Sequence, residues 1–179
     1  MLERDVAAGI KEVKGVKTAG TRTGNWLTQD QAQRLLDAPD LRTVKGVRDR
    51  AILAVLLGCG LRRAELAALT FDHVQQRDGR WAVVDLVGKG RRIRTVAMPA
   101  WAKTAIDAWT GIHGLADGQV FRSLWKNGAL RRASLTEQAV LDVVQSHARP
   151  LGLTIAPTTA GARSPSSPYA GGHGWSRSS

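Results

Sequence analysis

Apolar residues recur at helical spacing soon after the start of the chain. Thr28 is followed three residues later by Gln31, the signature of a capping box, in which each side chain bonds the backbone N–H of the other residue. We predict a short helix from this cap to Ala38, because the following Pro39 disfavours helical backbone before it. Its apolar face comprises Ala32, Leu35 and Leu36.

Two further helices are predicted before residue 70. Residues 44–58 are so rich in apolar side chains that a buried helix fits better than a half-exposed one. Gly58 and Gly60 predict its end. The next helix is expected to begin near Arg62 and to carry Leu66, Ala67 and Leu69.

The pattern then changes to one typical of β-structure. Residues 81–87 are rich in β-forming residues, and in residues 93–98 alternate side chains fall on opposite faces. Between them, residues 88–92 form a basic segment flanked by glycines and of hairpin length. We therefore predict an antiparallel pair of strands joined by a tight basic turn.

Helical spacing returns in the second half of the chain. Pro99 suits the first turn of a helix over about 100–111. Thr136 is a candidate cap for a last helix that runs to about His147. The apolar stripe of this last helix comprises Ala139, Val140, Val143 and Val144.

These elements predict an α+β fold, mostly helical, with a small antiparallel sheet. Residues 1–24 are basic and read as a linker, residues 25–157 as the folded part, and residues 158–179 as a disordered tail. From Pro157 onward the chain contains no Leu, Ile, Val, Met or Phe. Such a segment buries too little apolar surface to offset the entropy lost on ordering.

The charge of the chain points to a polyanionic partner. The formal net charge is +11, and nucleic acid is the commonest polyanion that basic domains bind. The alternative is a basic surface that serves solubility. Cys59 is the only cysteine, which excludes an internal disulfide and a paired-cysteine metal site. With no apolar run long enough for a membrane span, we expect a cytoplasmic protein.

Two basic positions could bind a phosphate. Arg62, at a predicted helix start, would present a planar fork of donors beside free backbone N–H groups, and Glu65 one turn later could hold it in place. A surface Arg–Glu pair of little consequence is the alternative. Lys89 lies in the glycine-flanked turn, which leaves a long cation free to extend, although such a tip can also be merely solvated.

Both segments resemble the tyrosine recombinase (phage integrase) family. Residues 56–70, read as LLGCGLRRAELAALT, resemble the family's first arginine box, and residues 88–94, read as GKGRRIR, resemble its lysine-bearing hairpin. The resemblance covers about residues 26–157. It implies a catalytic domain in which a tyrosine attacks a DNA phosphodiester while arginines, a lysine and histidines stabilise the transition state.

Residue by residue, the resemblance implies roles for positions in both segments. It makes Arg62 and Lys89 catalytic and Glu65 their support, and it implies DNA contacts by Arg63, Arg91, Arg92 and Arg94. The implied partner is double-stranded DNA, with self-association on the DNA. No cofactor, metal or small-molecule substrate is implied.

The second half of the family's site does not follow. A His-x-x-Arg box is expected after Pro157, but residues 158–164 read TTAGARS. Tyr169, the only tyrosine, lies too close to Pro157 to match the family's nucleophile. A one-base slip near the Pro157 codon would permit His-Asp-Arg-Arg-Arg-Thr-Phe over the same seven positions. We therefore expect a domain that is incomplete at its C-terminus, truncated and out of frame after Pro157.

Three functions are compatible with these observations. The first is a fragment of a site-specific recombinase from a mobile element, catalytically inactive as it stands. The second is a non-enzymatic DNA-binding remnant or regulator, and the third a basic interaction protein with no DNA role. Without the family's final helices, we expect Val140 and Val143 to lie exposed and the domain to be marginally stable.

Overall fold

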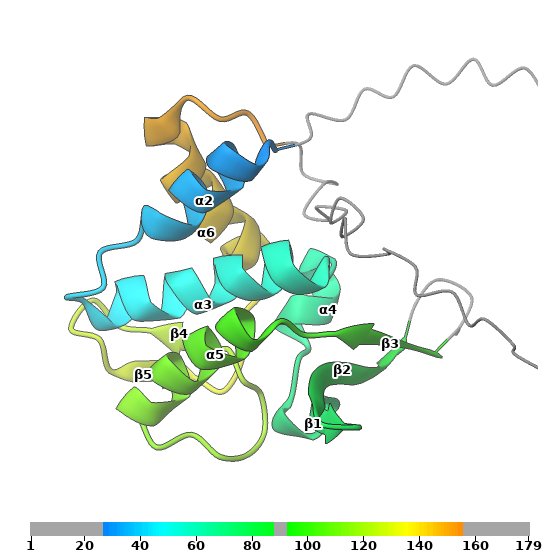
Figure 1. Cartoon of the computed structure of the whole chain (residues 1–179). Helices are drawn as coiled ribbons and strands as arrows, with labels where there is room; N and C mark the ends of the chain where they lie inside the picture. The colour runs from blue at the N-terminus through cyan, green and yellow to red at the C-terminus, as the bar shows by residue number, and fades with distance from the viewer. Residues whose placement is uncertain (1–26, 88–92, 156–179) are drawn as a thin grey trace, which may run out of the picture.

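A long central helix organises the computed structural model, which describes residues 27–87 and 93–155 (Figure 1). This helix, α3 (Val44–Cys59), is nearly all buried between its first and last turns. Thr43 accepts a hydrogen bond from the Gly46 N–H at its start, and Gly60 ends it in the left-handed conformation, with φ 62°. The dense apolar pattern of the sequence therefore predicted a core helix correctly.

Two capped helices lie on one side of α3 (Figure 1). Helix α2 (Gln29–Asp37) begins with the predicted capping box, in which Thr28 and Gln31 exchange hydrogen bonds of 2.9 and 3.2 Å. Helix α6 (Glu137–Ala148) begins at Thr136, whose hydroxyl accepts from the Ala139 N–H. A single 3₁₀ turn, η3 (Arg149–Leu151), follows α6.

The larger sheet has three antiparallel strands in the order β1-β2-β3. The predicted pair is present as β2 (Arg80–Val87) and β3 (Ile93–Ala97), with Val87 opposite Ile93 at the end where residues 88–92 connect them. Strand β1 (Val74–Arg77), preceded by the 3₁₀ turn η1 (Phe71–His73), was not expected. Alternate residues of β3 face inward, as Arg94 and Val96 do, and Met98 just after it is buried.

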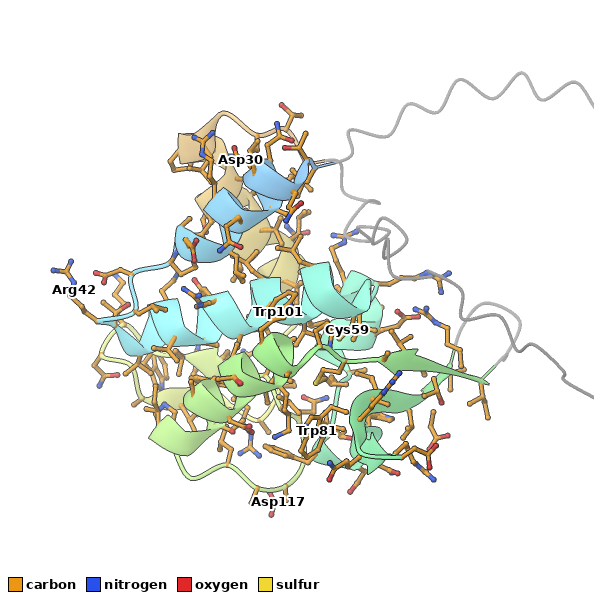
Figure 2. The ribbon with its side chains drawn as sticks, viewed as in Figure 1. Asp30, Arg42, Cys59, Trp81, Trp101 and Asp117 are labelled. Carbon is orange, nitrogen blue, oxygen red and sulfur yellow. The ribbon has the colours of Figure 1, made fainter. Side chains whose placement is uncertain are left out.

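Helix α5 (Ala100–Ile112) packs against α3 from the other side. Pro99 is the N-cap residue of α5, so it stands just before the first helical turn and not within it. Trp81 on β2 and Trp101 on α5 are labelled in Figure 2, where Trp101 lies beside the end of α3. The contact is close, because a Cβ at Gly58 would lie 3.0 Å from the Trp101 ring and the ring would have to shift to make room for it.

A second, smaller sheet was also unexpected. Strands β4 (Ser123–Leu124) and β5 (Leu130–Arg132) form a short hairpin. Its turn packs on the first residue of α3, since a Cβ at Gly128 would lie 3.3 Å from Val44 Cβ. The two sheets thus lie at opposite ends of α3 (Figure 1).

The expectation of exposed apolar residues on α6 was wrong. Val140 is fully buried and Val143 is only 6% exposed. Helix α6 packs on α4 (Arg63–Ala67), and Leu151, Leu153 and Ile155 just after it pack against the core. The chain that follows α6 therefore covers the side of the core that was expected to be open, and Val140 and Val143 give no reason to expect marginal stability.

The observed elements confirm an α+β fold that is mostly helical with small antiparallel sheets. The predicted linker (1–24), the basic turn (88–92) and the whole segment from Pro157 onward lie outside the described residues. Among the described helices, none is both long and apolar enough to cross a membrane. Within the same residues no cluster of His, Cys, Asp and Glu could hold a metal ion.

Candidate functional site

The candidate site begins where α3 turns into α4. The left-handed Gly60 redirects the chain, and Arg62 stands in extended conformation immediately before α4. Helix α4 is only five residues long and ends at Ala67, so Leu69 lies beyond it rather than on it. A helix this short contributes little macrodipole, and the side chains must therefore supply the electrostatics of this corner.

Glu65 holds both the backbone and the side chain of Arg62. Its Oε2 accepts the Arg62 backbone N–H at 2.7 Å, and its Oε1 accepts from Arg62 Nη1 at 3.3 Å. The Glu65 side chain is 7% exposed, whereas that of Arg62 is 65% exposed. The contact expected from the sequence is therefore present, but the Arg62 N–H is occupied and not free for a phosphate.

A second guanidinium shares the same carboxylate. Arg94 Nη2 on β3 donates to Glu65 Oε2 at 2.7 Å, and the Arg94 side chain is 40% exposed. Two arginines from different elements thus lie against one buried carboxylate, which leaves a net charge of +1. Because each guanidinium has five N–H donors and uses few of them here, both retain donors for an anion.

Lys89 lies in the sequence between β2 and β3, the strand that carries Arg94. Val87 and Ile93 are opposite each other in the sheet, and Arg94 follows Ile93, so the two residues that flank segment 88–92 are paired next to Arg94. Lys89, Arg91 and Arg92 themselves lie outside the described residues. Arg63, next to Arg62, is partly buried and has no carboxylate within 4 Å in the described chain.

A buried charge cluster that the sequence did not reveal joins α3 to α6. Asp49 is fully buried and accepts hydrogen bonds from Lys45 Nζ at 2.5 Å, Arg48 Nη2 at 2.7 Å and His147 Nε2 at 3.1 Å. Burial raises the pKa of this carboxyl, but the Arg48 charge and the three hydrogen-bonding partners outweigh it, and the pKa falls below its ordinary 3.8. His147 therefore has a structural partner.

Cys59 has no chemical part in the site. It is the last residue of α3 and only 5% exposed, and burial raises the pKa of its thiol to about 12 (Figure 2). Its thiol therefore stays protonated at neutral pH, and a protonated thiol is a poor nucleophile.

Comparison with known proteins shows the family of the chain. The family model described as "Phage integrase family" matches residues 25–168. The chain belongs to the phage integrase family. Arg62, Glu65, Lys89 and Arg94 all lie within the matched region.

Relatives with similar sequences are tyrosine recombinases. Tyrosine recombinase XerD of Pseudomonas putida is 36% identical over 129 residues, which are 71% of this chain and 42% of that protein. Tyrosine recombinase XerC of Pseudomonas syringae is 32% identical over 117 residues, which are 65% of this chain and 37% of that protein. The chain thus spans less than half the length of these relatives.

Solved structures of recombinases share the fold. XerA recombinase superposes with a TM-score of 0.56 at 20% identity, covering 75% of this chain and 46% of that one. XerH site-specific recombinase, in a pre-cleavage complex with its difH substrate, also gives a TM-score of 0.56, at 16% identity, covering 76% of this chain and 39% of XerH. At such identities the likeness concerns the fold alone.

Proposed function

We propose that this chain carries the cationic half of a DNA phosphoryl-transfer site of the tyrosine recombinase type. Arg62 and Lys89 would bind one backbone phosphate of duplex DNA. Glu65 and Arg94 would hold the corner in place, and Arg63, Arg91 and Arg92 would contact neighbouring phosphates. XerH, a structural neighbour, is described in complex with its difH substrate, which supports DNA as the partner class.

One observation carries the proposal: Glu65 is shared by Arg62 and Arg94. If the corner were an ordinary surface ion pair, one arginine would satisfy the carboxylate, and such a pair would contribute little. Here a second cation is brought in from β3, which leaves an uncompensated positive charge at a partly exposed site. An anion would neutralise that charge, and a phosphate accepts hydrogen bonds from guanidinium forks in good geometry.

The chemistry follows from the charge. When a nucleophile attacks a phosphodiester, negative charge grows on the oxygens of the pentacoordinate phosphorus. Fixed donors aimed at those oxygens stabilise the transition state, each typically by several kcal/mol, because they need no reorganisation as the charge develops. Glu65 keeps the Arg62 donors fixed, and Lys89 would protonate the leaving oxygen.

We further propose that the chain does not complete this reaction. None of its four histidines is followed three residues later by an arginine, and Tyr169 lies only twelve residues after Pro157. Removing members of a catalytic set that acts as a unit usually removes most of the rate. The missing His-x-x-Arg box and the position of Tyr169 favour a second function, DNA binding without cleavage. We also propose that the chain associates with itself on DNA and that it is cytoplasmic.

Salt-dependent binding to duplex DNA tests the proposal. We expect fluorescence anisotropy with a labelled 30-base-pair duplex to show affinity that falls steeply between about 50 and 200 mM salt, because phosphate contacts release counterions. Arg62→Ala should weaken binding and reduce the slope by about one. Arg34→Ala on α2, at an exposed arginine without a carboxylate partner, is the matched control. Absence of salt-dependent binding to the duplex would contradict a DNA partner and favour a protein partner.

A suicide DNA substrate that traps phosphotyrosine tests the proposed inactivity. We expect no covalent adduct on a denaturing gel. An adduct that disappears in a Tyr169→Phe variant would overturn this part of the proposal and leave the DNA-binding part intact.

A further inference from the structure

Strand β2 contains a β-bulge. Between the Val83–Val96 pair and the Leu86–Arg94 pair, two residues of β2 stand opposite one residue of β3. The second of the two, Asp85, has a φ of 56°, in the left-handed region. Aspartate is one of the few residues besides glycine that adopt this conformation readily. The residue type in the bulge therefore suits its backbone.

The bulge changes which side chains of β2 face the core. In a regular strand Val83 and Leu86 would lie on opposite faces, because they are three residues apart. Here both belong to the hydrophobic core, with exposures of 0% and 4%. On β3, Val96 and Arg94 are two residues apart and share the inner face. The extra residue in β2 thus places Leu86 directly beside Arg94, on the side where Glu65 lies.

Without the bulge, a charged residue would take the place of Leu86. If regular pairing continued beyond Val83, Asp85 would stand opposite Arg94. Directly opposed side chains in an antiparallel pair have Cβ atoms about 4.5–5.5 Å apart, which is within reach of an ion pair. Asp85 would then compete with Glu65 for the Arg94 guanidinium.

In the observed register Asp85 stays away from the corner. It is exposed, and its side chain has no hydrogen bond or ion pair with residues 27–87 or 93–155. Among the carboxylates that the structure describes, only Glu65 contacts Arg94, so the corner with Arg62 keeps its net positive charge. A second carboxylate would neutralise that charge and weaken the attraction for a phosphate.

We propose that the bulge at Val84 and Asp85 is a positioning element of the phosphate site. It places Leu86 instead of Asp85 opposite Arg94, and the corner therefore stays positively charged. The consequence for DNA binding rests on the proposed function, whereas the register can be tested without DNA. The alternative is a bulge that serves only the packing and twist of the sheet.

Two single-residue deletions test the register. Deletion of Asp85 or of Leu86 removes the extra residue of β2, and either variant can pair regularly with β3. Deletion of Asp85 leaves leucine opposite Arg94, so we expect it to bind a duplex at least as tightly as the wild type. Deletion of Leu86 puts the aspartate there. We expect it to bind more weakly, with a salt slope smaller by about one.

An Asp85→Asn substitution within the Leu86 deletion controls for the lost leucine. It keeps the packing defect and removes only the carboxylate, so binding should be restored. In an Arg94→Ala background the same substitution should restore nothing. In the intact chain, where Asp85 lies away from Arg94, its effect should be much smaller. If Asp85→Asn does not restore binding to the Leu86 deletion, the bulge serves only packing and twist, and the proposal is wrong.

Urea unfolding separates this inference from the proposed function. In the Leu86 deletion, Asp85→Asn should lower the urea midpoint when Arg94 is present but not when it is replaced by alanine, and the intact chain should show no such coupling. Coupling in a chain that does not bind DNA would support the register and contradict the proposed function. Absence of coupling in the Leu86 deletion would overturn the register. If the Leu86 deletion does not fold, weak binding by a folded Asp85 deletion would still contradict the proposal, because that variant keeps leucine opposite Arg94.

Discussion

Arg94 on β3 donates a hydrogen bond of 2.7 Å to Glu65 on α4, and this contact fastens the sheet to the helix corner that carries Arg62. The strand that leaves the Lys89 loop is therefore fixed relative to Arg62 through a single buried carboxylate. We interpret Arg94 as a positioning residue that holds β3 against the corner that carries Arg62.

Arg94→Ala should weaken duplex binding, because the sheet loses its contact with Glu65. Arg94→Lys should retain most of the affinity, since the contact uses one donor atom, Nη2, which an ammonium group can replace. Anisotropy at a fixed salt concentration measures both variants. Arg77→Ala, on strand β1 at the other edge of the same sheet, is the control for lost charge. If Arg94→Ala behaves like this control, the positioning role is wrong.

Asp49 should contribute strongly to stability and in a pH-dependent way. In an Asp49→Asn variant the amide NH₂ group would face the donors of Lys45 and His147, and the nearly buried Arg48 would lose its counter-charge. Loss of one partner from a buried ion pair costs on the order of 3 kcal/mol. Urea denaturation at pH 7 measures the loss, and Asp107→Asn, which removes the exposed carboxylate of the Lys103–Asp107 pair, should cost less than about 1 kcal/mol.

The pH dependence of this loss has a definite sign. The pKa of Asp49 is lowered by folding from 3.8, so its stabilisation is fully present above that value and disappears as the pH falls through the lower folded pKa. The difference in unfolding free energy between wild type and Asp49→Asn should therefore be constant from pH 7 to 5 and shrink below about pH 4. A difference that grows on acidification would contradict the assignment.

Cys59 should react with a thiol reagent only when the chain unfolds. Its thiol is buried, and with a pKa of about 12 its thiolate fraction at pH 8 is on the order of 10⁻⁴. Because it is the only cysteine, labelling with Ellman's reagent gives a single unambiguous signal. We expect very slow labelling in native buffer and rapid, stoichiometric labelling in 8 M urea. Fast labelling of the native chain would show that the end of α3 opens readily.

Local sequence rules predicted the helices and their caps well. The Thr28–Gln31 box and the Thr136 cap depend on residues three positions apart, which a sequence displays directly. The sheet was only partly predicted. Strand β1 reads Val-Gln-Gln-Arg and has one apolar residue, and β4 and β5 are two and three residues long, too short to establish a period.

Tertiary contacts in the site could not be predicted in the same way. Arg62 and Glu65 are three residues apart and their contact was expected, but Arg94 lies 29 residues from Glu65 and was interpreted only as a DNA-binding residue. The Asp49–His147 contact joins residues 98 positions apart. The burial of Val140 and Val143 likewise depends on packing with other elements, which the sequence pattern of α6 alone does not contain.

The most direct test of the account is a double-mutant cycle on duplex affinity with Arg62→Ala, Lys89→Ala and the double variant. If both cations bind one phosphate, the second substitution should cost less once the first is made, with a coupling energy above about 0.5 kcal/mol. Arg62→Ala combined with Lys126→Ala, at the opposite end of α3, should be additive within about 0.5 kcal/mol. Additive losses for Arg62 and Lys89 would contradict a shared phosphate.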